Sequence, residues 1–169
     1  KEAYSIYQVT TFENYLQASS LYKQGRIREA LQSIEKDLII NPDHIRSLTL
    51  LGRIFEERGE YRRAVEGYRQ LIGFNPDSPF GFQMIGRVYE IEKRWDQAVE
   101  NYEISLKLDP KQHEILNNLA LIYAMHRNQI ERGIRLIEKA LRLRPNVKKY
   151  EATLLKLSRH LYNIGFLRQ

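Results

Sequence analysis

The sequence repeats itself with a step of 34 residues, and its prolines show the step most plainly. They stand at Pro42, Pro76 and Pro110. Alanines keep the same step twelve positions earlier, at Ala30, Ala64 and Ala98. A fixed period of this size means that one supersecondary unit is copied along the chain, and that each copy buries its apolar face only against its neighbours. The chain is therefore predicted to form a repeat array, which offers an extended binding surface.

Other residue types keep the same register. An apolar residue followed by a very small one recurs at Leu51-Gly52, Ile85-Gly86 and Leu119-Ala120, and aromatic residues follow at Phe55, Tyr89 and Tyr123. The second half of the unit carries aromatic residues at Tyr61 and Trp95 and again at Tyr68 and Tyr102. Apolar residues spaced by three and four lie on one stripe of a helix, so each unit is predicted to contain two amphipathic helices. This pattern resembles the tetratricopeptide repeat, and the resemblance covers roughly residues 11 to 169.

The resemblance implies an all-α fold, a right-handed superhelical solenoid of antiparallel helix pairs. The fourth copy departs from the register, because Gly133, Ala140 and Pro145 all fall one position late. We place the inserted residue in a turn at 127–129, since a turn absorbs an insertion at less cost than a helix. The expected divisions are an N-terminal extension or helical lead-in (1–10) and a repeat domain (11–169) with repeats at 11–44, 45–78, 79–112 and 113–146, then a partial repeat or capping helix at 147–169.

Glycines have two predicted roles in the unit. Gly25 and Gly59 are expected to end the first helix by taking the left-handed conformation that other residues resist. Gly52 and Gly86 lie inside predicted helices, where glycine costs about 1 kcal/mol relative to alanine. We expect the missing side chain to let the neighbouring helix approach closely.

Length and composition are those of an ordinary packed, soluble domain, with 169 residues of which 43% are hydrophobic. No apolar run is long enough for a transmembrane segment, and the first ten residues lack the features of a secretory signal. The absence of cysteine fits a reducing cytoplasm, which we favour, or a periplasm. Because the first residue is Lys rather than Met and the last repeat is incomplete, we interpret the sequence as a fragment of a larger protein.

The positive charge is concentrated in the C-terminal third. Residues 1–112 hold 16 basic and 17 acidic residues, whereas residues 113–169 hold 11 basic and 4 acidic residues. This distribution favours an acidic partner, an anionic membrane surface or nucleic acid. The alternative is a solvated surface, because many of these cations lie on the second helix of the fourth repeat, which forms the outer face in the family that the chain resembles.

In that family the first helices of the repeats line a concave groove, so their unpacked side chains are the candidates for partner binding. These are Phe12, Tyr15, Tyr22, Arg46, Arg53, Phe80, Arg87, Asn117, Asn118 and Arg159. Guanidinium groups bind carboxylates in bidentate fashion, aromatic rings supply buried area, and the two asparagines offer hydrogen bonds to a peptide backbone. The alternative for Arg53 and Arg87 is pairing with glutamates along their own helices.

The sequence predicts no enzyme, no cofactor and no metal site. Its four histidines have no pair at the four-residue spacing of helical metal ligands, and it contains no glycine-rich phosphate loop and no nucleophile elbow. We expect the histidines to be surface or capping residues.

The predicted function is a protein-protein interaction scaffold that binds a peptide segment or helix of a partner, partly acidic, in the concave groove. One alternative is a structural or self-assembling module, a homo-oligomer that stacks through its incomplete C-terminal repeat. The candidate stacking residues are Leu154, Leu157, Leu161, Ile164 and Phe166. A further alternative is nucleic-acid binding by the basic third, although no specific nucleic acid is expected because the code of RNA-reading helical repeats is absent.

Overall fold

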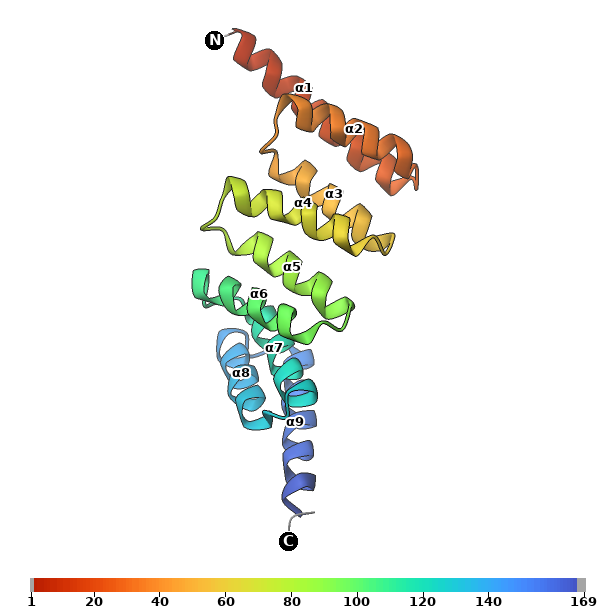
Figure 1. The fold of residues 1–169 in the computed structure, drawn as a ribbon. Helices are drawn as coiled ribbons and strands as arrows, with labels where there is room; N and C mark the ends of the chain where they lie inside the picture. Colours follow the sequence, from red (N-terminus) through yellow and green to blue (C-terminus); the bar gives the residue numbers. More distant parts are fainter. Residues whose placement is uncertain (1, 167–169) are drawn as a thin grey trace. The chain divides into compact units, whose positions relative to one another are not determined.

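The computed structural model describes residues 2–166, together with the side chains of residues 13–164. All regular secondary structure in this part of the chain is α-helical, which confirms the predicted all-α class (Figure 1). The helices found there are α1 (Glu2–Lys23), α2 (Ile27–Ile40), α3 (Ile45–Glu57), α4 (Tyr61–Phe74), α5 (Pro79–Ile91), α6 (Trp95–Leu108), α7 (His113–His126), α8 (Ile130–Leu143) and α9 (Lys148–Phe166).

The helices group into two compact units, unit 1 (Lys1–Val88) and unit 2 (Tyr89–Gln169). Within unit 1, α1 packs on α2, α3 packs on α4, and α2 also packs on α3. Within unit 2, α7 packs on α8, and α9 packs on both of them. These helices therefore pack against helices that are close to them in sequence, as a repeat array requires.

The turns between the two helices of a repeat share one backbone geometry. Each has three residues, and the middle one has a positive φ. Gly25 and Gly59 have φ values of 75° and 73°, as predicted, whereas Lys93 and Asn128 take the same position with φ values of 59° and 51°. Asparagine tolerates this conformation better than most residues with a side chain, whereas lysine seldom adopts it.

The extra residue of the fourth repeat lies between Tyr123 and Gln129. In the other turns the last residue bonds through its N–H to a carbonyl five residues back, as Glu60 does to Phe55. The N–H of Gln129 instead reaches the carbonyl of Tyr123, six residues back. The turn itself still has three residues. Helix α7 is one residue longer than α3 and α5, so the extra residue is accommodated at the end of α7 rather than within 127–129.

Glycine inside α3 permits a close contact with α4. A β-carbon added at Gly52 would lie 2.4 Å from Cε1 of Tyr68. Tyr68 is fully buried, and its hydroxyl donates a hydrogen bond to Oε2 of Glu56 at 3.3 Å. As predicted, the missing side chain at Gly52 allows a close approach from the neighbouring helix, and the group that approaches is the Tyr68 ring of α4.

A buried polar cluster joins α2 to α3. Asp37 is fully buried, and its Oδ2 accepts a hydrogen bond from the Ser47 hydroxyl and lies 2.5 Å from Nδ1 of His44. The repeat pattern does not predict this cluster, because the residue 34 positions after Asp37 is Leu71. His44 is thus held at the junction of two repeats by a carboxylate.

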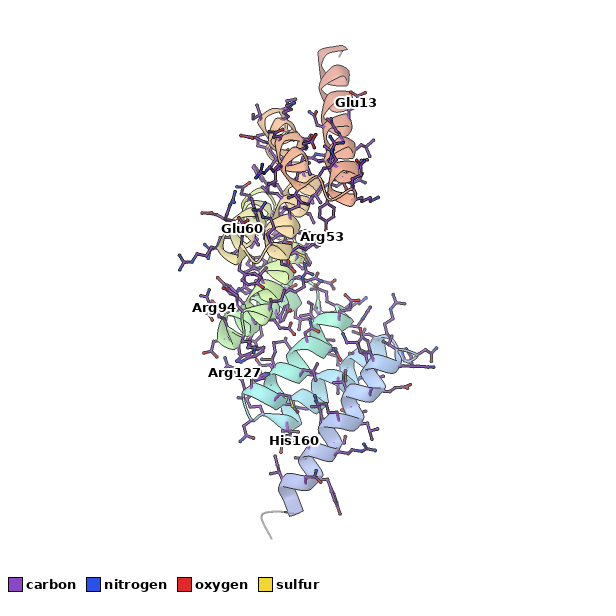
Figure 2. All side chains as sticks on the ribbon, turned by 90° about the vertical axis from the view of Figure 1, so that its right-hand side faces the viewer. Glu13, Arg53, Glu60, Arg94, Arg127 and His160 are labelled. Atoms are coloured by element: carbon purple, nitrogen blue, oxygen red, sulfur yellow. The ribbon has the colours of Figure 1, made fainter. Side chains whose placement is uncertain are left out.

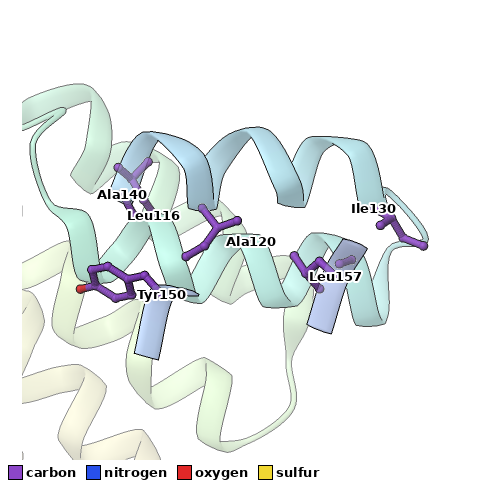
Figure 3. Close-up of a cluster of buried hydrophobic side chains, with 8 residues drawn as sticks. Leu116, Ala120, Ile130, Ala140, Tyr150 and Leu157 are labelled. Atoms are coloured by element: carbon purple, nitrogen blue, oxygen red, sulfur yellow. The ribbon is translucent and has the colours of Figure 1, made fainter. Parts of the chain in front are cut away.

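Helix α9 is anchored by the core of unit 2 (Figure 3). The core consists of Leu116, Ala120, Ala124, Ile130, Ile137, Ala140, Tyr150 and Leu157. Leu157 is fully buried there, and Leu154, Leu161 and Ile164 are partly buried against the same cluster. Four of the five residues predicted to stack on another molecule therefore pack within the chain, and the side chain of Phe166 lies outside the described part.

Tyr123 of α7 gives unit 2 a pH dependence in the alkaline range. Burial, and then the hydrogen bond that its hydroxyl donates to Glu103, raise the pKa of Tyr123 to about 12. Because an unfolded tyrosine has a pKa of about 10, this contribution to stability is complete below about pH 10 and is lost as the pH rises toward 12. We expect the midpoint of urea unfolding to fall over this range. Tyr123→Phe should show a smaller fall, and an equal fall would contradict the assignment.

Candidate functional site

Unit 1 contains a hollow of about 450 Å³ that runs along α1 and α3 to the start of α5. We call it the α1–α3 groove. Its lining consists of Tyr15, Ser19, Tyr22, Lys23, Ile45, Arg46, Thr49, Leu50, Arg53 and Phe80. Residues three and four apart share one face of a helix, which is why α1 and α3 each supply several neighbouring side chains. The structure thus brings together five of the residues that the sequence predicts for partner binding.

Aromatic and aliphatic side chains form much of the groove surface. Tyr15 and Tyr22 come from α1, Phe80 comes from α5, and Ile45 of α3 is 53% exposed. The ring of Tyr15 is fixed by an edge contact with His44, whose ring centre lies 5.5 Å away. The groove therefore offers apolar area on side chains that are already partly ordered, which lowers the entropic cost of binding.

Arg53 has two neighbours in the α1–α3 groove. Its Nε lies 3.1 Å from Oε1 of Glu57 on the same helix, and its guanidinium carbon lies 5.3 Å from the ring centre of Tyr22. Tyr22 also donates a hydrogen bond to Glu57, and this bond, together with the one from Arg53, lowers the pKa of Glu57. The alternative of pairing along its own helix is therefore what the structure shows for Arg53.

Arg46 and Lys23 are the cations of the groove that carry no carboxylate partner among the described side chains. The guanidinium carbon of Arg46 lies 5.9 Å from the ring centre of Tyr15, and both cations are exposed. No residue that lines the groove is acidic. The groove consequently combines apolar surface with positive charge that is available to a ligand.

Arg87 lies apart from the groove lining. Its Nη2 is 2.8 Å from Oε2 of Glu56, which also accepts the hydrogen bond from Tyr68. The Nε of Arg87 is buried and has no hydrogen-bond partner. Arg87 therefore connects α5 to α3 through Glu56.

The remaining predicted residues have separate surroundings. Asn117 is fully buried, and its Oδ1 accepts a hydrogen bond from the hydroxyl of Thr153 at 2.9 Å. Asn118 is half-buried and donates to the Tyr102 hydroxyl at 3.3 Å. Packing of α9 over α7 thus encloses Asn117, which leaves its amide inside unit 2 rather than on a surface.

Arg159 is exposed on α9 and lines a hollow of about 420 Å³ in unit 2, together with Met125 and Lys156. The side chain of Phe12 lies outside the described residues.

Five residues that line the groove were not predicted, namely Ser19, Lys23, Ile45, Thr49 and Leu50. Lys23 lies in the last turn of α1. Ile45 is the first residue of α3 and reaches the groove from the end of the helix. Lys23 and Ile45 are both exposed, so the signal for them is a polar or apolar residue at an exposed position near either end of a first helix.

Three of the histidines lie in or beside contacts within the fold. Nδ1 of His113 lies 2.6 Å from the hydroxyl of Tyr150, and the His126 ring stacks on Trp95 with the ring centres 3.8 Å apart. His160 is exposed on α9 (Figure 2). Among the described residues, no group of three or more His, Cys, Asp or Glu side chains is arranged to hold a metal ion. No helix in that part of the chain is both long and apolar enough to cross a membrane.

Comparison with known proteins identifies the repeat. The family model described as tetratricopeptide repeat matches residues 15–79 and 84–148. No curated protein matches the sequence. Many solved structures are similar in fold, and three of them illustrate the range.

A crystal structure of MamA has a TM-score of 0.75 and 16% identity, and the match covers 89% of this chain and 81% of that one. PilF of Pseudomonas aeruginosa has a TM-score of 0.78 and 18% identity, over 93% of this chain and 71% of that one. A thermophilic repeat protein of Thermus thermophilus has a TM-score of 0.66 and 19% identity, over 89% and 82%. At these identities the likeness shows the fold alone, a solenoid of helix pairs.

Proposed function

The chain belongs to the tetratricopeptide repeat family, and from that premise we propose that its α1–α3 groove binds a segment of a partner protein. Repeat proteins of this family are typically non-catalytic scaffolds for protein-protein interaction. The proposed ligand is an extended peptide or a short helix that carries a large apolar side chain next to a carboxylate.

One observation carries the proposal: Lys23 and Arg46, which have no carboxylate partner among the described side chains, stand beside aromatic rings in a groove with no acidic lining. A guanidinium group binds a carboxylate through two parallel hydrogen bonds, and this fixes the orientation of the ligand. Tyr15 and Phe80 would supply apolar area, which contributes most of the affinity at such sites. Arg53 would add a weaker attraction, because Glu57 already balances part of its charge.

The basic residues of unit 2 support nucleic-acid binding less well. Arg127 lies 2.5 Å from Oδ1 of Asp96, and Arg132 lies 2.6 Å from Oε1 of Glu103. Ion pairs of this kind reduce the number of cations available to phosphates, and therefore the affinity expected from charge alone. A protein ligand remains the proposal for this chain.

Peptide selection on the purified chain tests the proposal. We expect displayed random peptides that bind to be enriched in Asp or Glu beside a large apolar residue, and the strongest of them can be synthesised and titrated by fluorescence anisotropy. Arg46→Glu should raise the dissociation constant of such a peptide by about tenfold or more, because it places a negative charge beside the ligand carboxylate. Tyr15→Ala should weaken binding by removing an apolar anchor.

Arg69→Glu is the matched control. Arg69 is exposed on α4, outside the groove lining, and the substitution makes the same change in net charge. It should leave the dissociation constant unchanged. Selected peptides without acidic residues, or equal losses in the two charge variants, would contradict binding in the α1–α3 groove.

A further inference from the structure

We propose that the ligand of the α1–α3 groove is an extended segment with two carboxylate side chains four residues apart and a large apolar side chain midway between them. This rests on the binding of a partner segment proposed above, and it adds the spacing and the backbone conformation of that segment. It follows from the separation of Arg46 and Lys23, the two groove cations without a carboxylate partner among the described side chains, and from the side chains between them.

Two contacts between α1 and α3 show that these helices run in the same direction along the groove. The guanidinium carbon of Arg46 lies 5.9 Å from the ring centre of Tyr15, and that of Arg53 lies 5.3 Å from the ring centre of Tyr22. The second contact comes seven positions after the first in both helices. Because a helix rises 1.5 Å per residue, the two contacts mark two levels of the groove that are about 10 Å apart.

The two cations without a carboxylate partner belong to different levels. Arg46 lies at the first level, beside Tyr15, whereas Lys23 comes directly after Tyr22 at the second level. Lys23 follows Tyr15 by eight positions, which corresponds to about 12 Å along α1. The groove therefore presents two separate positive charges to a ligand.

Shorter side chains line the groove between the two levels. Ser19 of α1 and Thr49 of α3 each lie about halfway between them. The Thr49 hydroxyl donates a hydrogen bond to the carbonyl of Ile45 at 2.6 Å, so it does not require a polar group of a ligand. Leu50, which also lines the groove, is only 8% exposed. Two short side chains beside a buried leucine leave space for one large apolar side chain, whose burial would contribute affinity.

The charge of the groove favours carboxylates at both levels. None of the described side chains that line it is acidic. Glu57, which contacts Tyr22 at the second level, accepts hydrogen bonds from Tyr22 and Arg53, and these partners offset its charge. A ligand carboxylate could therefore approach Lys23 or Arg46 without meeting an unpaired like charge.

An extended chain matches this arrangement. Alternate side chains of a strand point to the same face, and the rise is about 3.3 Å per residue. Residues two apart on that face are therefore about 7 Å from each other, and residues four apart are about 13 Å from each other. The longer distance agrees with the separation of about 12 Å between the levels of Arg46 and Lys23, and the residue midway between the two carboxylates then faces Ser19 and Thr49. Because this pattern reads the same in both directions, it fits whichever way the ligand runs.

A helical ligand fits the groove less well. A helix is about 10–12 Å wide, so a length of about 12 Å encloses roughly 1,000 Å³. The hollow measures about 450 Å³, and most of a helix would therefore remain outside it. An extended segment can place three alternate side chains in the hollow and leave the others in water.

Two seven-residue peptides of equal composition test the spacing on the full chain. Each contains two glutamates, one phenylalanine and four serines, and is capped at both ends, one cap being an uncharged fluorescent label. In the first peptide the glutamates stand two positions before and two positions after the phenylalanine. In the second they are two apart, and the phenylalanine follows them by two. All three side chains share one face in both peptides, but we expect the second to bind about fivefold more weakly by fluorescence anisotropy, because it loses one exposed ion pair.

A double-mutant cycle assigns each glutamate to its cation. Lys23→Gln and Arg46→Gln should each weaken binding of the first peptide by about threefold to fivefold. After one glutamate is replaced by glutamine, only one of these two variants should weaken binding further, and replacement of the other glutamate should reverse which variant does so. Lys36→Gln is the control, because Lys36 is an exposed lysine of α2 outside the groove lining, and it should leave the dissociation constant unchanged.

The outcomes separate the spacing of the ligand from binding in the groove. Equal affinity of the two peptides, or no binding of the first, would overturn the spacing, while peptide selection with Arg46→Glu still tests the groove itself. Coupling of both cations to the same glutamate would overturn the spacing as well. Tighter binding of an alanine-rich helical peptide with its glutamates seven apart would overturn the extended conformation. Equal losses in Lys23→Gln and Lys36→Gln would instead contradict binding in the groove.

Discussion

Gly52→Ala is expected to destabilise unit 1, although alanine is the better helix former. The substitution gains about 1 kcal/mol of helix propensity, but the new β-carbon would lie 2.4 Å from Cε1 of Tyr68. Tyr68 is fully buried and hydrogen-bonded to Glu56, so its ring has little freedom to move. Overpacking of this kind costs about 1–3 kcal/mol, and we expect a net loss toward the upper end of that range, measured by urea unfolding followed by circular dichroism.

A double-mutant cycle with Tyr68→Ile identifies the cause. The first repeat carries Ala18 and Ile34 at the two equivalent positions, and both are fully buried there. Gly52→Ala combined with Tyr68→Ile recreates that pair. The double variant should therefore be less destabilised than the sum of the single variants, by an interaction energy within the range of about 0.5–3 kcal/mol seen for residues in contact. Strict additivity would show that the ring is not the obstacle.

Leu157→Ala should have a comparably large effect in unit 2. Leu157 is fully buried between α9 and the α7–α8 pair, and the smaller side chain would leave a cavity in the core. Substitutions of this type cost about 2–5 kcal/mol. Because α9 is the last described helix and packs only on α7 and α8 in unit 2, we expect it to lose its amide protection in hydrogen exchange before the rest of the unit does.

Leu155→Ala provides the control on the same helix. It removes the same atoms two positions away, from a side chain that is 52% exposed. The free energy of unfolding should change by less than about 0.5 kcal/mol. If both variants lost equal stability, the assignment of Leu157 to the core and of Leu155 to the surface would be contradicted.

Much of the fold follows from periodicity, because a helix pair in a repeat array meets mainly its neighbours. The resemblance to the tetratricopeptide repeat predicted the all-α class, and Gly25 and Gly59 predicted the left-handed turns that the structure contains. Lys93 and Asn128 adopt the same turn without glycine. Asparagine is one of the residues that tolerate a positive φ, whereas the residue type does not predict this conformation for Lys93.

The candidate site was predictable in part, for a similar reason. Helical spacing places Tyr15 and Tyr22 on one face of α1 and Arg46 and Arg53 on one face of α3, so their common exposure follows from the register. Pairing along the helix was the alternative for Arg53 and Arg87, and the structure shows it for Arg53 with Glu57. Arg87 instead pairs with Glu56 of another helix, and helical spacing does not predict that contact.

The sequence by itself determined which residues occupy equivalent positions in successive repeats. Helical periodicity and turn residues depend on a few neighbouring positions, and the same pattern recurs in each repeat. Only the tertiary structure decided how equivalent residues differ, because burial and ion pairing arise from contacts between helices. Asn117 is internal because α9 covers it, and Arg87 links α5 to α3 through its ion pair with Glu56.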